Sequence, residues 1–296
     1  MKTIIAATDF SPNANNALQY AAALAAATEA RLVLFHHFTY PQPATDFPEV
    51  YPAIFVDDLA GDFEKRLELV KDELMRSYPI EITCVVRALT MSGDLEAVFQ
   101  EEQADLVVMG IHGQSAVMNA LLGNVTSATI RRGQLPVLVV PRGVVFHPIK
   151  KILFPCDGEA LPDAGILQPL LDLATGFDAY IEVFTLFDLE KTPDLVPAVN
   201  NASRTKNNLE TLLADTRHGY AYENEASVDQ GILYEATRSG ADLVTMISHH
   251  HSFWSTLFNQ SDTQRIAASI TLPLLVLGEK TPETAPEEVS TLEENQ

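Results

Sequence analysis

The sequence is poor in cysteine, in basic residues and in long apolar runs, and each shortage excludes a class of protein. Its 296 residues include only two cysteines, Cys84 and Cys156, without CxxC spacing, so neither a disulfide scaffold nor a thiol redox motif is expected. Lys and Arg number 19 against 40 Asp and Glu, and a net charge of −21 argues against binding to nucleic acid or anionic membranes. No apolar run approaches the roughly 18–20 residues of a transmembrane helix. Residues 1–11 also lack a secretory apolar region, and we therefore expect a cytoplasmic protein.

The apolar content, 47% of the chain, is high enough for a substantial core, and the length suits two ordinary domains. In the first half, short apolar runs alternate with helical patterns, and this alternation predicts a parallel sheet with helices on both faces. The expected strands cover residues 3–7, 31–38, 80–88, 106–109 and 137–140. We expect the strand order 3-2-1-4-5, with a ligand crevice between strands 1 and 4, where the order reverses.

Residues 104–141 carry the densest group of motifs in the chain. A buried strand is followed at once by Gly110 and Gly113, and Gly123 then precedes a helix over residues 125–132. Glycines can adopt positive φ and let the backbone approach a ligand, while a helix N-terminus attracts phosphate. The pattern therefore predicts a phosphate cradle. It is neither a P-loop nor a dinucleotide fingerprint, and on motif context alone the glycines could serve only to make tight turns.

The spacing Gly-x2-Gly-x9-Gly-Asn, followed by a helix and then Pro-Val-Leu-Val-Val-Pro, resembles the ATP-binding signature of the universal stress protein family. Asn124 departs from it, because the family usually has Ser or Thr there. The resemblance implies an ATP site, with Mg²⁺ as a further expectation, in which Asp9 helps to hold adenine. His37 takes a position where the family often has Val. The residues expected to bind the nucleotide are Thr8, Asp9, His37, Gly110, His112, Gly113, Gly123, Asn124, Val125 and Thr126.

The second half of the chain repeats the first. Residues 150–157 match residues 2–9 at an offset of 148, and residues 179–186 fall at the same offset from residues 31–38. Residues 241–277 match residues 104–140 without a gap, at an offset of 137. This duplication predicts two tandem doubly wound, Rossmann-like (HUP-type) domains, each with a five-stranded parallel sheet of order 3-2-1-4-5. We place them at 1–142 and 149–278, followed by a disordered acidic tail at 279–296.

The repeat has lost the glycines of the cradle, since Ile247, His250 and Gln260 replace them. A Cβ at these positions should crowd a ligand, so we expect no ATP in the second domain. Residues 249–251 are three histidines, but consecutive histidines converge poorly on one ion, and we expect no metal site there.

Three hypotheses for function remain open. The first is a nucleotide-responsive regulatory protein that binds ATP in its N-terminal domain and acts on an unknown protein partner. The second is a slow ATPase, for which His112 is the nearby titratable residue, although no Lys or Arg clamp is evident. The third is an interaction protein without nucleotide, in which the fifth strands of the two domains pair and the tandem imitates a dimer within one chain. Two chains could also form a homodimer.

Overall fold

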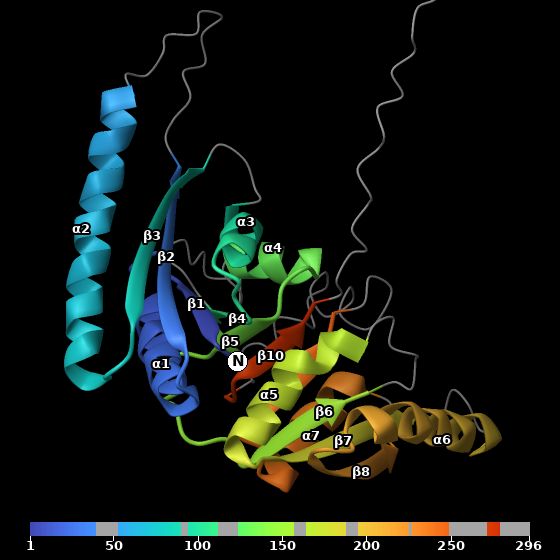
Figure 1. Ribbon diagram of the computed structural model, residues 1–296. Coiled ribbons are helices and arrows are strands. Elements are labelled where there is room, and N and C mark those ends of the chain that lie inside the picture. Colours follow the sequence, from blue (N-terminus) through green and yellow to red (C-terminus); the bar gives the residue numbers. More distant parts are fainter. Residues whose placement is uncertain are drawn as a thin grey trace, which may run out of the picture.

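The computed structural model (Figure 1) describes eight stretches of the chain, and the fold is stated for these alone. They are residues 1–39, 53–89, 94–111, 124–156, 164–187, 195–224, 227–248 and 271–278. The first half contains β1 Thr3–Ala7, α1 Pro12–Thr28, β2 Arg31–Thr39, α2 Ala53–Ser77, β3 Ile82–Leu89, α3 Asp94–Glu101, β4 Leu106–Gly110, α4 Asn124–Arg132 and β5 Val137–Val140. The second contains β6 Lys151–Pro155, the 3₁₀ turn η1 Ala164–Leu167, α5 Gln168–Phe177, β7 Tyr180–Phe187, α6 Leu195–Leu212, β8 Arg217–Asn224, α7 Val228–Ser239, β9 Leu243–Ile247 and β10 Leu274–Leu277.

The two halves share one ten-stranded sheet, in the order β3-β2-β1-β4-β5-β10-β9-β6-β7-β8. Strands within each half are parallel, which confirms the expected 3-2-1-4-5 order in both. The halves join where β5 and β10 pair antiparallel, with Leu138 opposite Leu275. The fifth strands therefore pair within the chain, as the dimer-like arrangement requires.

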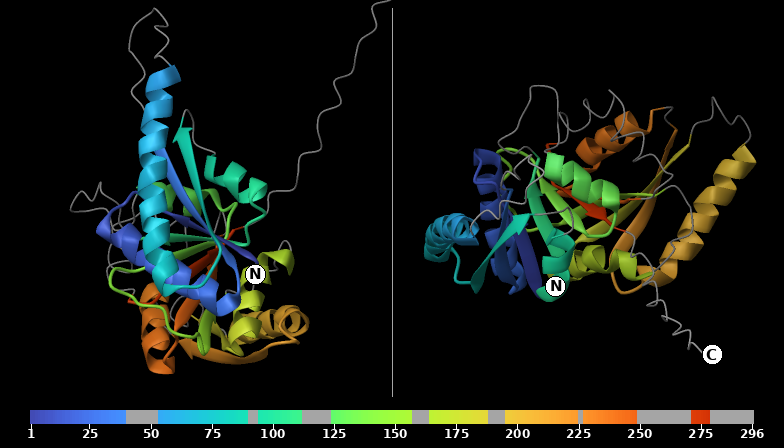
Figure 2. Two further views of the ribbon diagram at one scale, coloured as in Figure 1. Left: turned by 60° about the vertical axis from the view of Figure 1, so that its left-hand side comes forward. Right: turned by 90° about the horizontal axis from the view of Figure 1, so that it is seen from above.

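Helices cover both faces of the sheet, and each face has a core that runs across both halves (Figure 2). On one face, α1, α2, α5 and α6 bury residues such as Leu18, Leu67, Leu170 and Leu209 against the strands. On the other, α3, α4 and α7 contribute Val98, Ile130 and Ile232 among others. Because neither core is interrupted between β5 and β10, the halves are packed as one body.

The helix α1 follows directly from the sequence after β1. The Ser11 hydroxyl accepts a hydrogen bond from the Ala14 N–H at 3.1 Å, which caps the helix N-terminus, and Pro12 occupies the first turn. An alanine-rich face then packs closely on the sheet. The helix ends at Glu29, whose left-handed backbone (φ 56°) directs its N–H to the Ala25 carbonyl.

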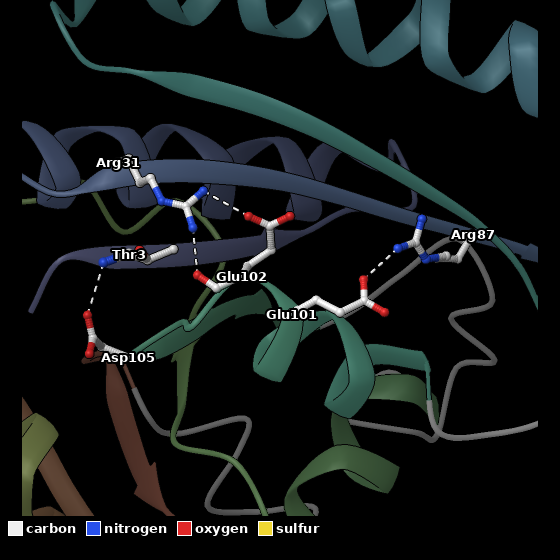
Figure 3. Close-up of polar contacts among 6 residues, drawn as sticks. All are labelled: Thr3, Arg31, Arg87, Glu101, Glu102 and Asp105. Atoms are coloured by element: carbon white, nitrogen blue, oxygen red, sulfur yellow. Dashed lines mark hydrogen bonds and ion pairs between the residues drawn. The ribbon is translucent and has the colours of Figure 1, made fainter.

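The amino ends of the strands are held by the same device in each half. The Asp105 carboxylate accepts hydrogen bonds from the backbone N–H groups of Lys2 and Thr3, the second of which is drawn in Figure 3, and Asp242 does the same for Lys150 and Lys151. Each aspartate precedes the fourth strand of its half and so fixes the first and fourth strands to each other. The carboxyl ends of the two strands are thereby held in the same register.

The repeat is confirmed, but one expected offset was wrong. Thr3 lies opposite Arg31 in the first half, and its equivalent Lys151 lies opposite Tyr180 in the second, so the second strands are offset by 149 rather than 148. The left-handed residues that end the preceding helices, Glu29 and Asp178, have the same offset. The extra residue therefore lies between β6 and the end of α5. The offset of 137 holds for β9 and β10.

The expected acidic tail, 279–296, lies outside the described residues. Within the stretches that the structure describes, no helix has the combination of length and apolar character needed to cross a membrane. Neither cysteine is in a disulfide, and burial raises the pKa of the Cys84 thiol to about 12, so this thiol stays protonated at neutral pH.

Candidate functional site

The candidate site lies at the carboxyl ends of β1 and β4, where the strand order of the first half reverses. β1 has β2 on one side and β4 on the other, and the chain leaves both strands toward the same edge. In open α/β sheets this edge is where ligands bind. The residues that line it come from the turn after β1, from the end of β4 and from the start of α4.

The turn after β1 is closed by its own side chains. The Phe10 N–H donates to the Thr8 hydroxyl at 2.9 Å, and the Ser11 N–H donates to the Asp9 carboxylate at 2.9 Å. Phe10 adopts a left-handed backbone (φ 62°), which a residue other than glycine holds only when its surroundings fix it. The Asp9 carboxylate thus orders the turn, and a carboxylate group can accept more than one hydrogen bond.

Gly110 is required for close packing and not for a positive φ. A Cβ built on Gly110 would lie 2.9 Å from the Asn13 carbonyl oxygen and 3.3 Å from the Ala14 nitrogen, both in the first turn of α1. The backbone φ of Gly110 is not positive, which corrects the expectation that glycine is needed here for its conformation. The absent side chain lets the N-terminus of α1 lie directly against the end of β4.

The start of α4 is fixed to the same point. The Thr126 hydroxyl donates to the Gly110 carbonyl at 3.1 Å, and the Thr126 side chain is buried. Asn124, Val125 and Thr126 form the beginning of the helix, so their N–H groups have no partner within it. The N-termini of α1 and α4 therefore meet around Gly110, and neither helix has an acidic residue in its first turn. The α1 end already has the Asp9 carboxylate on its Ser11 N–H, so the helix end that favours an anion is that of α4.

The histidines at the end of β2 point to opposite faces of the sheet. His37 shares the face of Phe35, is half-buried, and has its ring 6.0 Å from the Phe35 ring. His36 shares the face of Phe38 and is buried, and its Nδ1 lies 2.8 Å from the Thr8 carbonyl oxygen. His36 was missing from the sequence-based site, although strand alternation puts it on the opposite face to His37 and the parallel pairing of β2 with β1 brings it beside Thr8.

The remaining expected residues cannot be placed. His112, Gly113 and Gly123 lie outside the described residues, as do His249, His250, His251 and Gln260 of the second half. Of the expected nucleotide ligands, the structure brings together Thr8, Asp9, Gly110 and the start of α4. Among the residues that the structure describes, no group of three His, Cys, Asp or Glu side chains could hold a metal ion.

The corresponding edge of the second half is built differently. Cys156 takes the place of Thr8, and its N–H donates to the Phe184 carbonyl at 2.9 Å as that of Thr8 does to Phe35. Ile247 takes the place of Gly110 and is buried in a core cluster that also contains Ile166 and Leu167. These two residues belong to a 3₁₀ turn, whereas the equivalent positions in the first half are α-helical.

A polar groove of about 580 Å³ lies at the opposite, amino end of the first-half strands. Its lining includes Lys2, Arg31 and Glu102, and the guanidinium of Arg31 is 2.8 Å from the Glu102 carboxylate (Figure 3). Arg87, farther along β3 and opposite His37, forms a second pair with Glu101 at 2.7 Å. Since these charges satisfy each other and tie α3 to β2 and β3, we assign this end a structural role.

The fold and the edge described above define a doubly wound α/β protein of the Rossmann-like class, duplicated within one chain. The family model of the universal stress proteins matches residues 1–141. A universal stress protein from Thermus aquaticus is 34% identical over 145 residues, which cover 47% of this chain and 98% of that protein. The chain therefore belongs to the universal stress protein family.

Solved structures match the tandem arrangement. A universal stress protein from Archaeoglobus fulgidus has a TM-score of 0.66 at 17% identity, covering 94% of this chain and 98% of its own. A functionally unknown protein from Pseudomonas aeruginosa has a TM-score of 0.53 at 16% identity, covering 95% of this chain and 93% of its own. At these identities the likeness concerns the fold alone, and it extends over both halves.

Proposed function

We propose that this protein binds ATP, together with Mg²⁺, in its first half only, and that the nucleotide regulates its interaction with a protein partner. The observation that carries the proposal is the N-terminus of α4, which Thr126 fixes at Gly110 beside the start of α1 and which has no acidic residue in its first turn. In a chain with a net charge of −21, an anion needs such local compensation in order to bind.

The residues of the site have complementary roles in this proposal. The N–H groups of Asn124, Val125 and Thr126 would receive phosphate oxygens, while the Thr126 hydroxyl keeps the helix at the end of β4. The Asp9 carboxylate, held in its turn by the Ser11 N–H, would accept from the adenine amine. His37, near the end of β2, and Thr8, directly after β1, would lie beside adenine. His112, Gly113 and Gly123 would complete the loop between Ile111 and Asn124.

The second half is proposed to serve as a scaffold. The buried Ile247 side chain fills the position at which Gly110 admits the α1 N-terminus. We propose domain limits of 1–142 and 149–278, a cytoplasmic location, and no binding to nucleic acid or membranes. The pairing of β5 with β10 occupies the fifth-strand edges within the chain. A homodimer would therefore have to use another surface.

The test removes one helix N–H without removing the helix. Asn124→Pro deletes the donor at the first helical position, where proline is tolerated, and the matched variant Asn124→Ala keeps the donor but loses the side chain. Calorimetric titration with MgATP should give one site per wild-type chain, similar affinity for Asn124→Ala, and affinity at least about tenfold weaker for Asn124→Pro.

Three results would each contradict part of the proposal. Absence of MgATP binding to the wild-type protein would reject the nucleotide function, and two sites per chain would reject binding by the first half alone. Equal affinity of the alanine and proline variants would show that the Asn124 N–H is not a phosphate donor.

A further inference from the structure

The buried histidine His36 links the candidate site to α2. Its side chain is 6% exposed, and its Nδ1 lies 2.8 Å from the Thr8 carbonyl oxygen. Thr8 begins the turn that carries Asp9, and the Thr8 N–H is itself bound to the Phe35 carbonyl of the same neighbouring strand. The β1 end is therefore attached to β2 by one backbone and one side-chain hydrogen bond.

The protonation state of His36 follows from its partner. A carbonyl oxygen can only accept, so Nδ1 carries the proton and donates it. Nε2 is buried and has no hydrogen-bond partner among the described residues. Burial is the largest influence on the His36 pKa and lowers it, and the nearby His37 and Arg66 act in the same direction, whereas the bond to Thr8 and the Asp9 charge oppose it. The ring is thus neutral at pH 7, in a single tautomer.

The other surroundings of the ring are aromatic. The His36 ring lies 4.6 Å from the Phe10 ring and 4.4 Å from the Phe63 ring, measured between centroids. Phe63 is on α2, and from the same helix the Arg66 guanidinium lies 4.0 Å above the Phe10 ring. Side chains of α2 therefore contact both His36 and Phe10, the residue with the left-handed backbone in the Asp9 turn.

We propose that His36 is a positioning residue for the nucleotide site, which holds the Thr8–Ser11 turn through the Thr8 carbonyl and couples it to α2 through the ring contacts with Phe63. This inference rests on the proposed function, and it assigns to His36 no contact with the nucleotide. The turn can place the Asp9 carboxylate beside adenine only while the preceding Thr8 carbonyl is held in position by His36.

The second half lacks this arrangement. The structural offset of 149 places Thr185 at the position of His36, and Cys156 stands at that of Thr8. The Thr185 side chain is buried, and its hydroxyl has no partner among the described residues. Among the described residues, Thr185 therefore does not supply the hydrogen bond that His36 makes in the half to which we assign the nucleotide.

Three variants test the role of the hydrogen bond. His36→Asn retains an N–H donor at the Nδ1 position, His36→Phe keeps an aromatic ring without a donor, and Phe38→Leu alters the same cluster without touching Thr8. MgATP affinity, thermal stability and amide exchange of Ser11 and Ala14 are measured for each. We expect His36→Asn to stay within about threefold of the wild-type affinity and His36→Phe to lose about fivefold or more, as the loss of one hydrogen bond implies. Phe38→Leu should lower stability and leave affinity unchanged.

The outcomes separate this inference from the proposed function. If the wild-type protein binds MgATP and His36→Phe binds equally well, the positioning role is wrong and the proposed function stands. If the wild-type protein does not bind, the proposed function fails, and the exchange data decide whether His36 holds the turn. Faster exchange of the Ser11 and Ala14 amides in His36→Phe, but not in His36→Asn, supports that role, and unchanged exchange overturns it.

Discussion

The substitution Gly110→Ala should destabilise the protein even when no nucleotide is present. The new Cβ would lie 2.9 Å from the Asn13 carbonyl oxygen and 3.1 Å from its carbon, closer than such atoms normally approach. Both are backbone atoms in the first turn of α1, so relief requires a shift of the helix relative to β4. Overpacking of this kind costs about 1–3 kcal/mol in free energy of unfolding.

A second glycine provides the matched control. Gly61 lies inside α2, and a Cβ added there meets nothing within 4 Å. Gly61→Ala should therefore raise the free energy of unfolding by about 0.5–1 kcal/mol, because alanine loses less backbone entropy in a helix. The same chemical change is thus expected to have opposite signs at the two positions.

Urea unfolding followed by circular dichroism measures both changes, and thermal unfolding gives an independent check. At roughly 2–4 °C per kcal/mol, Gly110→Ala should lower Tm by roughly 2–12 °C. A free energy of unfolding within 0.5 kcal/mol of the wild type would refute the packing argument. Gly110 would then matter only for the ligand.

Two further predictions concern the junction of the halves and the buried histidine. Gly278→Ala should lower Tm, because the new Cβ would lie 2.7 Å from the Gly133 carbonyl oxygen and 2.8 Å from the Leu135 nitrogen. An unchanged Tm in calorimetry would contradict this close approach. Because the pKa of His36 is lowered from 6.5 in the folded protein, the unfolded chain binds the proton first as the pH falls, and stability is lost below about pH 6.5. Urea titrations at pH 7.5, 6.5 and 5.5 should show that the free energy of unfolding falls less steeply with decreasing pH in His36→Asn than in the wild type. Equal slopes would refute the assignment of this pH dependence to His36.

The fold of the described residues could be predicted because each element has a clear local pattern. Continuous apolar runs such as Leu106–Met109 have few alternatives to a buried parallel strand, and Ser11-Pro12 is a strong helix start. The pairing of β5 with β10 could also be anticipated, since unpaired strand edges favour association. The offset of the second strands could not be found, because the residue inserted before Asp178 changes no pattern that the sequence displays.

The candidate site was predicted less completely, and for reasons that involve tertiary contacts. The sequence indicates that Gly110 is special, but only the position of Asn13 reveals that packing against α1 is the cause. The sequence also draws attention to His37, because it takes the position where the family often has Val. The neighbouring His36, however, makes the buried contact with Thr8. Alternation along β2 separates the two histidines by face, and which face meets Phe63 depends on α2.

The difference between the halves follows from how each uses the end of its fourth strand. Burying an isoleucine side chain contributes about 1.5–3 kcal/mol, so the second half gains core stability from Ile247 at the position where the first half has Gly110. The first half has no such side chain there, and a bound ligand at 100 times its Kd would contribute a comparable amount, about 2.7 kcal/mol. Because both cores run across the junction, that contribution would stabilise the sheet as a whole and not the first half alone. An ATP-binding first half would thus depend on its ligand for stability that the second half obtains from its own sequence.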